Sequence, residues 1–293
     1  MNDPYVSVKG LAKSFGEKRV LAGIDATVRA GDVVGLLGLN GAGKTTLLEI
    51  LLGLSPPSAG SALLFGNPAV AATATAKARI GFVPQNDELI GLFTGNQYLD
   101  LIATFYPDWD ARFAEKLVAE WGIEARKIIL GYSVGQRQKL SIIAALAHKP
   151  DLLVLDEPVA SLDPLARRQF LQQIVEAATD ERRAVVFSSH IVSDVERLAN
   201  VIWVLKQGQL LWQGDLDTLK ESVIRVHTRA DAAPTVRARL RRVVAERSVD
   251  LSGHKLVALR APDEDWSDLE QQLGAGAQIE RLGLEDIFVE LHS

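Results

Sequence analysis

Short, uninterrupted apolar runs alternate with longer amphipathic segments through the middle of the chain. Residues 32–38 (DVVGLLG), 151–156 (DLLVLD) and 184–189 (AVVFSS) are strand-length runs without apolar–polar alternation. Strands that are buried on both faces of a parallel sheet have this composition. Helical spacing follows in residues 47–52, 165–178 and 191–199. Strands that alternate with helices predict an α/β fold with a mostly parallel sheet.

The start of the chain and the segment after residue 89 have other patterns. Residues 5–9, 19–21 and 24–28 are short and separated by turn residues, which predicts antiparallel strands. Residues 71–78 (AATATAKA) have low complexity and are expected to be a connector. From residue 89 to about residue 129 the spacing is helical, so we expect a helical insert. Its aromatic residues are Tyr98, Phe105, Tyr106, Trp109 and Trp121.

The pattern changes again after about residue 220. Residues 222–229 and 254–260 are expected to be strands. Pro234 suits a first helical turn, and Gly274 suits a helix end. Three helices are expected from apolar residues that share one face. These residues are Val236, Leu240, Val243 and Val244, then Trp266, Leu269 and Leu273, and finally Leu284, Ile287, Phe288 and Leu291. We interpret residues 1–219 as one domain and residues 220–293 as a small α/β accessory domain.

Composition and charge narrow the class of protein. Hydrophobic residues make up 47% and charged residues 24% of the 293 residues, as in ordinary globular proteins. The net charge of -5 argues against a nucleic-acid partner, which needs a basic surface. The absence of cysteine excludes disulfides and cysteine metal sites. The first residues lack the apolar core of a signal peptide, and the apolar runs are too short to span a bilayer. We therefore expect a cytosolic protein that reaches a membrane only through a partner.

Residues 38–45 (GLNGAGKT) match the phosphate-binding P-loop pattern in full. Glycines let the backbone N–H groups wrap around phosphates at a helix N-terminus, Lys44 reaches the β- and γ-phosphates, and the Thr45 hydroxyl ligates Mg²⁺. The alternative is a plain glycine-rich turn, but a strand precedes the motif and a helix follows it, as the motif requires. The candidate ATP-binding residues here are Gly38, Leu39, Asn40, Gly41, Ala42, Gly43, Lys44, Thr45 and Thr46.

Residues 152–157 (LLVLDE) supply the complementary acids. Asp156 at the end of a buried strand can hold Mg²⁺, directly or through water. Glu157 beside it can act as the general base that activates the attacking water. An acidic strand end alone would not indicate a function. Here the two acids occur in a chain that also contains a P-loop, which favours the catalytic interpretation.

With these motifs in order, the chain resembles the ATPase subunits of ABC transporters over roughly residues 1–215. Five smaller motifs of that family are present. Phe15 (LAKSFG) corresponds to the aromatic that stacks on adenine, Gln85 (GFVPQ) to the Q-loop glutamine, residues 130–136 (LGYSVGQ) to the family signature, residues 160–163 (ASLD) to the D-loop, and His190 (FSSH) to the switch histidine. The resemblance implies a P-loop NTPase core with an antiparallel β subdomain and a helical subdomain at about residues 87–145.

The resemblance also implies roles for these residues. Gln85 contacts Mg²⁺ or the attacking water, and His190 hydrogen-bonds the γ-phosphate. ABC ATPases form head-to-tail dimers with ATP between the P-loop of one subunit and the signature of the other. Asp163 then lies at the dimer interface. The dimer is a homodimer or a heterodimer with a paralogous ATPase. The signature residues that complete the site in trans are Ser133, Val134, Gly135 and Gln136.

The signature departs from the usual LSGGQ at two positions. Tyr132 replaces the leucine and Val134 replaces the first glycine. A β-branched residue fails at that position only if φ must be positive. We predict a working variant signature, with a degenerate site as the alternative.

The segments FYPDWD and SHIVSDVERLA and the ending LEDIFVEL resemble ATPases of ABC-2-type exporters. This implies an ATP-hydrolysing subunit, bound at the cytoplasmic face of the membrane to an integral-membrane permease that residues 85–98 contact. Two rival functions are a soluble ABC ATPase of translation or DNA repair and a non-hydrolysing regulatory module.

The arginines of the accessory domain suggest an interface with anionic lipids, or, as the alternative, a solvated face with internal acid partners. These arginines are Arg225, Arg229, Arg237, Arg239, Arg241, Arg242 and Arg247.

Overall fold

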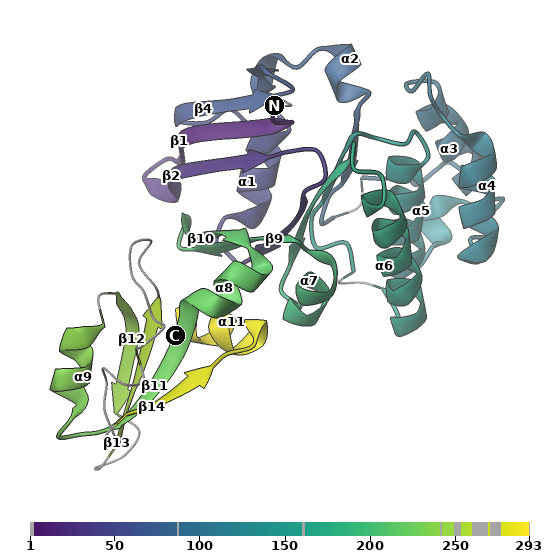
Figure 1. Ribbon diagram of the computed structural model, residues 1–293. Helices are drawn as coiled ribbons and strands as arrows, with labels where there is room; N and C mark the ends of the chain where they lie inside the picture. Colours follow the sequence, from purple (N-terminus) through teal and green to yellow (C-terminus); the bar gives the residue numbers. More distant parts are fainter. Residues whose placement is uncertain are drawn as a thin grey trace. The chain divides into compact units, whose positions relative to one another are not determined.

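The computed structural model describes residues 3–86, 88–159, 162–240, 242–248, 253–259, 269 and 277–292 (Figure 1). The chain forms two compact units, Met1–Gln213 and Gly214–Ser293. The boundary expected after residue 219 falls inside helix α8 (Leu216–Ser222), so the second unit begins before that helix.

A six-stranded sheet forms the centre of the first unit. Its strand order is β10-β9-β3-β8-β7-β6, and β3 lies between β8 and β9 in parallel register. Every residue of β3, β7 and β8 is buried, which confirms the α/β prediction made from their uninterrupted apolar runs. The strands are β3 (Val33–Leu37), β6 (Ile80–Val83), β7 (Leu152–Leu155), β8 (Ala184–Ser189), β9 (Val201–Lys206) and β10 (Gln209–Asp215).

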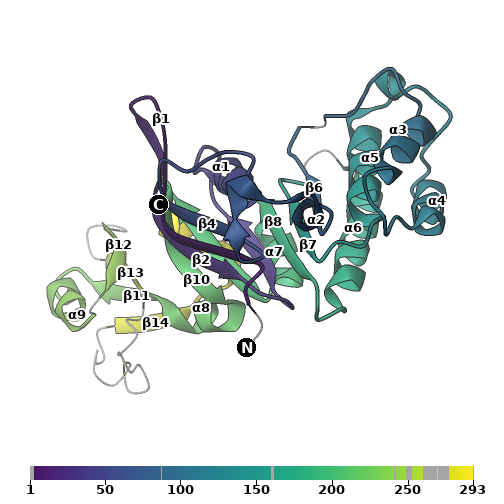
Figure 2. The same ribbon diagram turned by 90° about the horizontal axis from the view of Figure 1, so that it is seen from above.

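An antiparallel sheet of order β2-β1-β4-β5 stands beside α1 (Lys44–Leu51) in both views (Figures 1 and 2). The core of the unit joins α1, both sheets and Trp203 of β9. The segments at residues 19–21 and 24–28, expected as separate strands, belong to one longer strand because β2 pairs with β1 across both of them. The strands are β1 (Val6–Phe15), β2 (Lys18–Val28), β4 (Ala59–Leu64) and β5 (Asn67–Pro68).

The expected helical insert is present, with α3 (Gly95–Ala103) and α4 (Ala111–Glu120) packed beside α5 (Val134–Leu146) (Figure 1). Of its aromatic residues, Trp121 is buried and Phe105 is exposed. The expected connector at residues 71–78 contains the short helix α2 (Ala74–Lys77), which Thr73 caps. The remaining helices of the unit are the 3-10 turns η1 (Ala69–Ala71) and η2 (Ile129–Gly131), α6 (Pro164–Ala178) and α7 (Val192–Leu198).

The second unit is built on an antiparallel sheet of order β12-β13-β11-β14. Its core includes Ile224, Leu256 and Val236, the last from α9. The prediction that one helix carries Val236, Leu240, Val243 and Val244 was wrong at its C-terminal end. The chain becomes extended at Leu240, and Val243 starts a strand. The expected helix with Trp266 and Leu273 lies outside the described residues. After α8, the described elements of this unit are β11 (Val223–Arg229), α9 (Ala233–Arg239), β12 (Val243–Ser248), β13 (Gly253–Leu259), β14 (Ala277–Arg281) and α11 (Leu284–His292).

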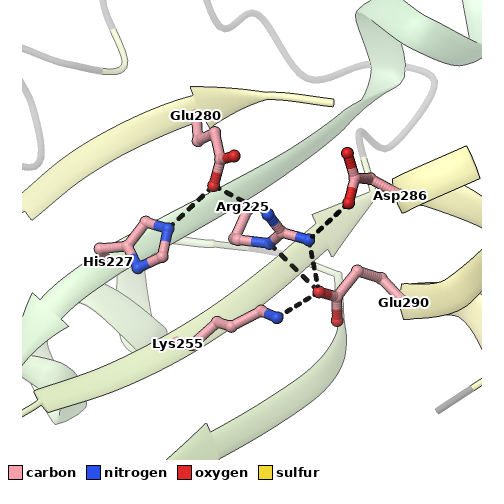
Figure 3. Close-up of polar contacts among 6 residues, drawn as sticks. All are labelled: Arg225, His227, Lys255, Glu280, Asp286 and Glu290. Atoms are coloured by element: carbon pink, nitrogen blue, oxygen red, sulfur yellow. Dashed lines mark hydrogen bonds and ion pairs between the residues drawn. The ribbon is translucent and has the colours of Figure 1, made fainter. Parts of the chain in front are cut away.

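A charged network joins three of these strands to α11 (Figure 3). The guanidinium of Arg225 lies 2.9 Å from a carboxylate oxygen of Glu280 and 2.7 Å from one of Glu290. Arg229 and Arg237 also pair with carboxylates of the same unit. These pairs support the alternative of internal acid partners for these three arginines over an interface with anionic lipids. The network comprises Arg225, His227, Lys255, Glu280, Asp286 and Glu290.

Candidate functional site

The loop between β3 and α1 has the backbone that a phosphate site needs. Gly43 precedes the helix with φ +106, a conformation that side chains disfavour. A Cβ added to Gly38 would lie 2.7 Å from the carbonyl oxygen of Leu205, so only glycine fits there. The N–H groups of the first turn of α1 have no partners within the helix and can donate to an anion.

Lys44 is the first residue of α1, and its side chain is nearly buried. Its ammonium donates to the carbonyl oxygen of Gly38 at 2.8 Å and lies 3.2 Å from Oε1 of Glu157. These contacts hold the positive charge of Lys44 over the loop, and the carboxylate of Glu157 neutralises part of that charge.

Asp156 follows β7, and it is held at both carboxylate oxygens. The Thr45 hydroxyl donates to Oδ2 at 2.6 Å, and the Ser188 hydroxyl donates to Oδ1 at 2.5 Å. Asp156 is only 1% exposed, so this carboxylate is fixed in one orientation. A hydroxyl, a carboxylate and the nearby amide of Gln85 are hard oxygen donors of the kind that Mg²⁺ prefers. The residues present therefore fit a magnesium ion.

Glu157 has an unusual backbone conformation, with φ +49. Its N–H donates to the Ser188 hydroxyl at 2.8 Å, and its Oε2 lies 2.8 Å from Nδ1 of His190. The side chain is buried beside Lys44. A left-handed conformation costs on the order of 1–3 kcal/mol in a residue with a side chain, and such strain concentrates at functional sites.

Lys44, Thr45 and Glu157 line a cavity of about 530 Å³, which lies in the range of small-molecule sites. Gly38, Ala42, Asp156 and His190, expected at the site, do not line it. Four lining residues were not expected from the sequence: Lys18, Arg19 and Val20 of β2, and Gln207 in the turn after β9. The full lining is Lys18, Arg19, Val20, Leu39, Asn40, Gly41, Gly43, Lys44, Thr45, Thr46, Gln85, Glu157 and Gln207.

Comparisons with known proteins agree with this geometry. A family described as "ABC transporter" matches residues 21–160, and an AAA domain family of type IV toxin–antitoxin systems matches residues 128–193. Over 238 residues the chain is 32% identical to the ABC transporter ATP-binding protein YdbJ of Bacillus subtilis, covering 79% of this chain and 77% of YdbJ. The chain belongs to the ABC transporter ATP-binding proteins. It is an ATPase of that family.

Two further relatives extend the comparison. The Nod factor export ATP-binding protein I of Ralstonia nicotianae is 32% identical over an alignment that covers 98% of this chain and 94% of that protein. A solved structure of an ATP-binding subunit of an ABC transporter has a TM-score of 0.69 and 28% identity, covering 74% of this chain and 92% of that one. The similarity to the Ralstonia protein therefore extends over almost the whole chain.

Phe15 and Asp163 of this ABC ATPase do not line the cavity. Phe15 ends β1, is 53% exposed and lies under the ammonium of Lys13 at 4.8 Å. Asp163 caps α6, and the N–H of Ala166 at 2.9 Å is the main cause that lowers the pKa of this carboxyl. Two D-loop residues, at positions 160 and 161, lie outside the described residues.

The signature forms the start of α5. Ser133 caps the helix in a capping box with Gln136, in which the Ser133 hydroxyl accepts the Gln136 N–H at 3.2 Å. Val134 is the first residue of the helix, does not have positive φ, and is 52% exposed. The Val134 side chain is therefore not part of the packed core. None of the residues from Ser133 to Gln136 lines the cavity of its own chain.

Proposed function

We propose that this ATPase powers export of a substrate through a separate integral-membrane permease, in the manner of ABC-2-type exporters. The similarity to a protein named for Nod factor export supports the direction, because it spans 98% of this chain and therefore includes the second unit. The substrate is a property of the permease, and this chain does not specify it.

The observation that carries the proposal is the hydrogen-bonded series that joins Thr45, Asp156, Ser188, Glu157 and His190. Thr45 and Glu157 line the cavity, Asp156 contacts Thr45, and His190 contacts Glu157. This supports a metal-binding role for Thr45 and Asp156, with Glu157 as general base next to His190. ATP phosphates would lie on the P-loop amides and Lys44.

Each group has a step in hydrolysis. Thr45, Asp156 and Gln85 would hold Mg²⁺, which would supply positive charge for the phosphate oxygens. Glu157 accepts the proton of the attacking water, and His190 orients the γ-phosphate. Lys44, which contacts Glu157, would bind the β- and γ-phosphates.

A second chain completes the site in this proposal. The residues from Ser133 to Gln136 line no part of the cavity of their own chain, and they form the N-terminus of α5, a helix end that suits a phosphate from a partner's nucleotide. Asp163, which caps the neighbouring α6, would lie at the dimer interface. The dimer is either a homodimer or a heterodimer with a paralogous ATPase.

A second cavity of about 400 Å³ supports a permease contact. Its walls are largely apolar and include Leu89, Tyr98, Tyr106 and His148. The ring of His148 stacks on Tyr106 at 3.8 Å, and burial lowers the pKa of His148, so its imidazole stays neutral. We propose that a cytoplasmic helix of the permease packs here, which places the chain at the cytoplasmic face of the membrane. Within the described residues, no helix is both long and apolar enough to cross a bilayer.

The deciding experiment compares Mg-ATPase turnover and oligomeric state in ATP for the wild type and Glu157→Gln. Loss of the general base should lower turnover by about 10²–10⁴-fold. The variant should accumulate as an ATP-bound dimer. A wild type that neither hydrolyses ATP nor dimerises with its permease present would instead support the non-hydrolysing regulatory module.

A further inference from the structure

The buried hydroxyl of Ser188 bonds to the Asp156 carboxylate and to the backbone N–H of Glu157. Ser188 lies in β8, between the P-loop strand β3 and the strand β7 that carries the acids, and pairs with Leu36. Its exposure is 0%. A hydroxyl has one proton to donate and two lone pairs that accept.

Both capacities are used. The Ser188 proton goes to Oδ1 of Asp156 at 2.5 Å, and its oxygen accepts the N–H of Glu157 at 2.8 Å. The first bond leaves Oδ2 of Asp156 directed at Thr45. The second holds the backbone of Glu157 in its strained conformation, with φ +49.

We propose that Ser188 is a positioning residue for ATP hydrolysis that sets the metal-binding carboxylate and the general base together. Through Asp156 it fixes the orientation of a metal ligand, and through the N–H of Glu157 it directs that carboxylate to Lys44 and His190. This inference rests on the proposed function.

Removing the hydroxyl leaves two buried polar groups without partners. In Ser188→Ala, Oδ1 of Asp156 loses its donor and the N–H of Glu157 loses its acceptor. Asp156 can then turn away from Thr45. Loss of a partner that orients a metal ligand typically lowers metal affinity or activity by about 10–100-fold.

The test measures metal and nucleotide binding separately on the full chain. The first readout is ATP affinity without divalent metal, by calorimetry in excess chelator. The second is affinity of the ADP complex for Mn²⁺, followed by electron paramagnetic resonance. The third is the Mg²⁺ concentration for half-maximal ATPase activity. For Ser188→Ala we expect the affinity for ATP without metal to stay close to that of the wild type. The affinity for Mn²⁺ should be weaker by about tenfold or more, and the Mg²⁺ concentration for half-maximal activity should rise by the same factor.

Two further variants separate positioning from general destabilisation. Ser188→Thr keeps the hydroxyl and should restore most of the metal affinity. Ser222→Ala removes an equally buried serine hydroxyl from the second unit and should leave all three readouts unchanged. If Ser188→Ala fails to fold, Ser188→Cys, which retains a weak donor and acceptor of similar size, should show an intermediate loss.

Unchanged Mn²⁺ affinity and Mg²⁺ half-saturation in a folded Ser188→Ala or Ser188→Cys would overturn the proposal. Failure of the proposed function would be distinct, because the wild type itself would then lack Mg-ATPase activity with its permease present.

Discussion

The hydroxyl of Thr45 and the carboxylate of Asp156, 111 residues apart in the sequence, are joined by a hydrogen bond of 2.6 Å. The bond links the first turn of α1 to the end of β7. In the sheet, β8 lies between β3 and β7. Thr45 and Asp156 therefore meet beyond the C-terminal ends of these strands. The hydroxyl and the carboxylate proposed to hold the metal are therefore in direct contact.

Replacing Thr45 by valine tests this arrangement. Thr45→Val keeps the branched shape but removes the hydroxyl, so Asp156 loses a donor and the metal loses a ligand. Mg²⁺ affinity of the nucleotide complex and turnover should both fall by about 10–100-fold. Thr45→Ser, which keeps the oxygen, is the matched control and should remain near wild type. Equal metal affinities for the two variants would contradict the assignment.

The exposed side chain of Val134 leads to a second prediction. Since Val134 starts a helix without positive φ, Val134→Gly should change ATPase activity by no more than about twofold, as for other surface substitutions. Ser133→Ala should do more, because it removes a cap worth about 1 kcal/mol and the hydroxyl proposed to bind the partner's nucleotide. A gain of tenfold or more in Val134→Gly would show that the valine lowers activity.

The apolar cavity beside α3 gives a third prediction. Leu89→Asp introduces a carboxylate into a half-buried wall of this cavity. If a permease helix packs there, the charge would be buried without a partner, and association with host membranes should weaken by about tenfold or more. Sedimentation of the chain with those membranes measures this. Val70→Asp, at an exposed valine outside the lining, is the control. Equal membrane association of both variants would contradict the proposal that a permease helix packs in this cavity.

The sequence predicted the parts of the site that depend on local pattern. A P-loop and an acid pair after an apolar strand are recognisable because each function needs several residues within one short segment. Lys18, Arg19 and Gln207 were not recognised, because they reach the cavity only through the pairing of β2 and the turn after β9. No role was predicted for Ser188. It lies 31 residues from Glu157 along the chain, and only the pairing of β8 with β7 brings the two residues together.

The second unit shows the same limit for secondary structure. Val236 and Val243 have helical spacing, but Val243 pairs with Ala258 of β13, and this pairing prevails over the local pattern. The strand β14 was not predicted, because its segment AQIER contains few apolar residues. It joins the sheet by pairing with β11.

The last prediction concerns the acid sensitivity of the second unit. The pKa of Glu280 lies below its usual value of 4.5 because His227 and then Arg225 donate to it. Burial alone would raise the pKa of Glu290, but the bonds from Lys255 and Arg225 outweigh burial and lower it. Because both pKa values are lower in the fold, the unfolded chain binds more protons. The network therefore stabilises the unit above about pH 4.5 and loses its effect as the pH falls through the lowered pKa values.

Arg225→Met keeps the apolar stem but removes the guanidinium from Glu290, which is 2% exposed. Breaking a buried ion pair costs about 3 kcal/mol, although Lys255 still contacts Glu290. Hydrogen exchange of β11 and α11 should be faster in this variant at pH 7 and should change less on acidification than in the wild type. Arg229→Met is the control, because Arg229 and Asp231 form a mostly exposed pair worth less than about 1 kcal/mol. Wild-type protection of α11 in Arg225→Met at pH 7 would show that apolar packing alone holds this helix.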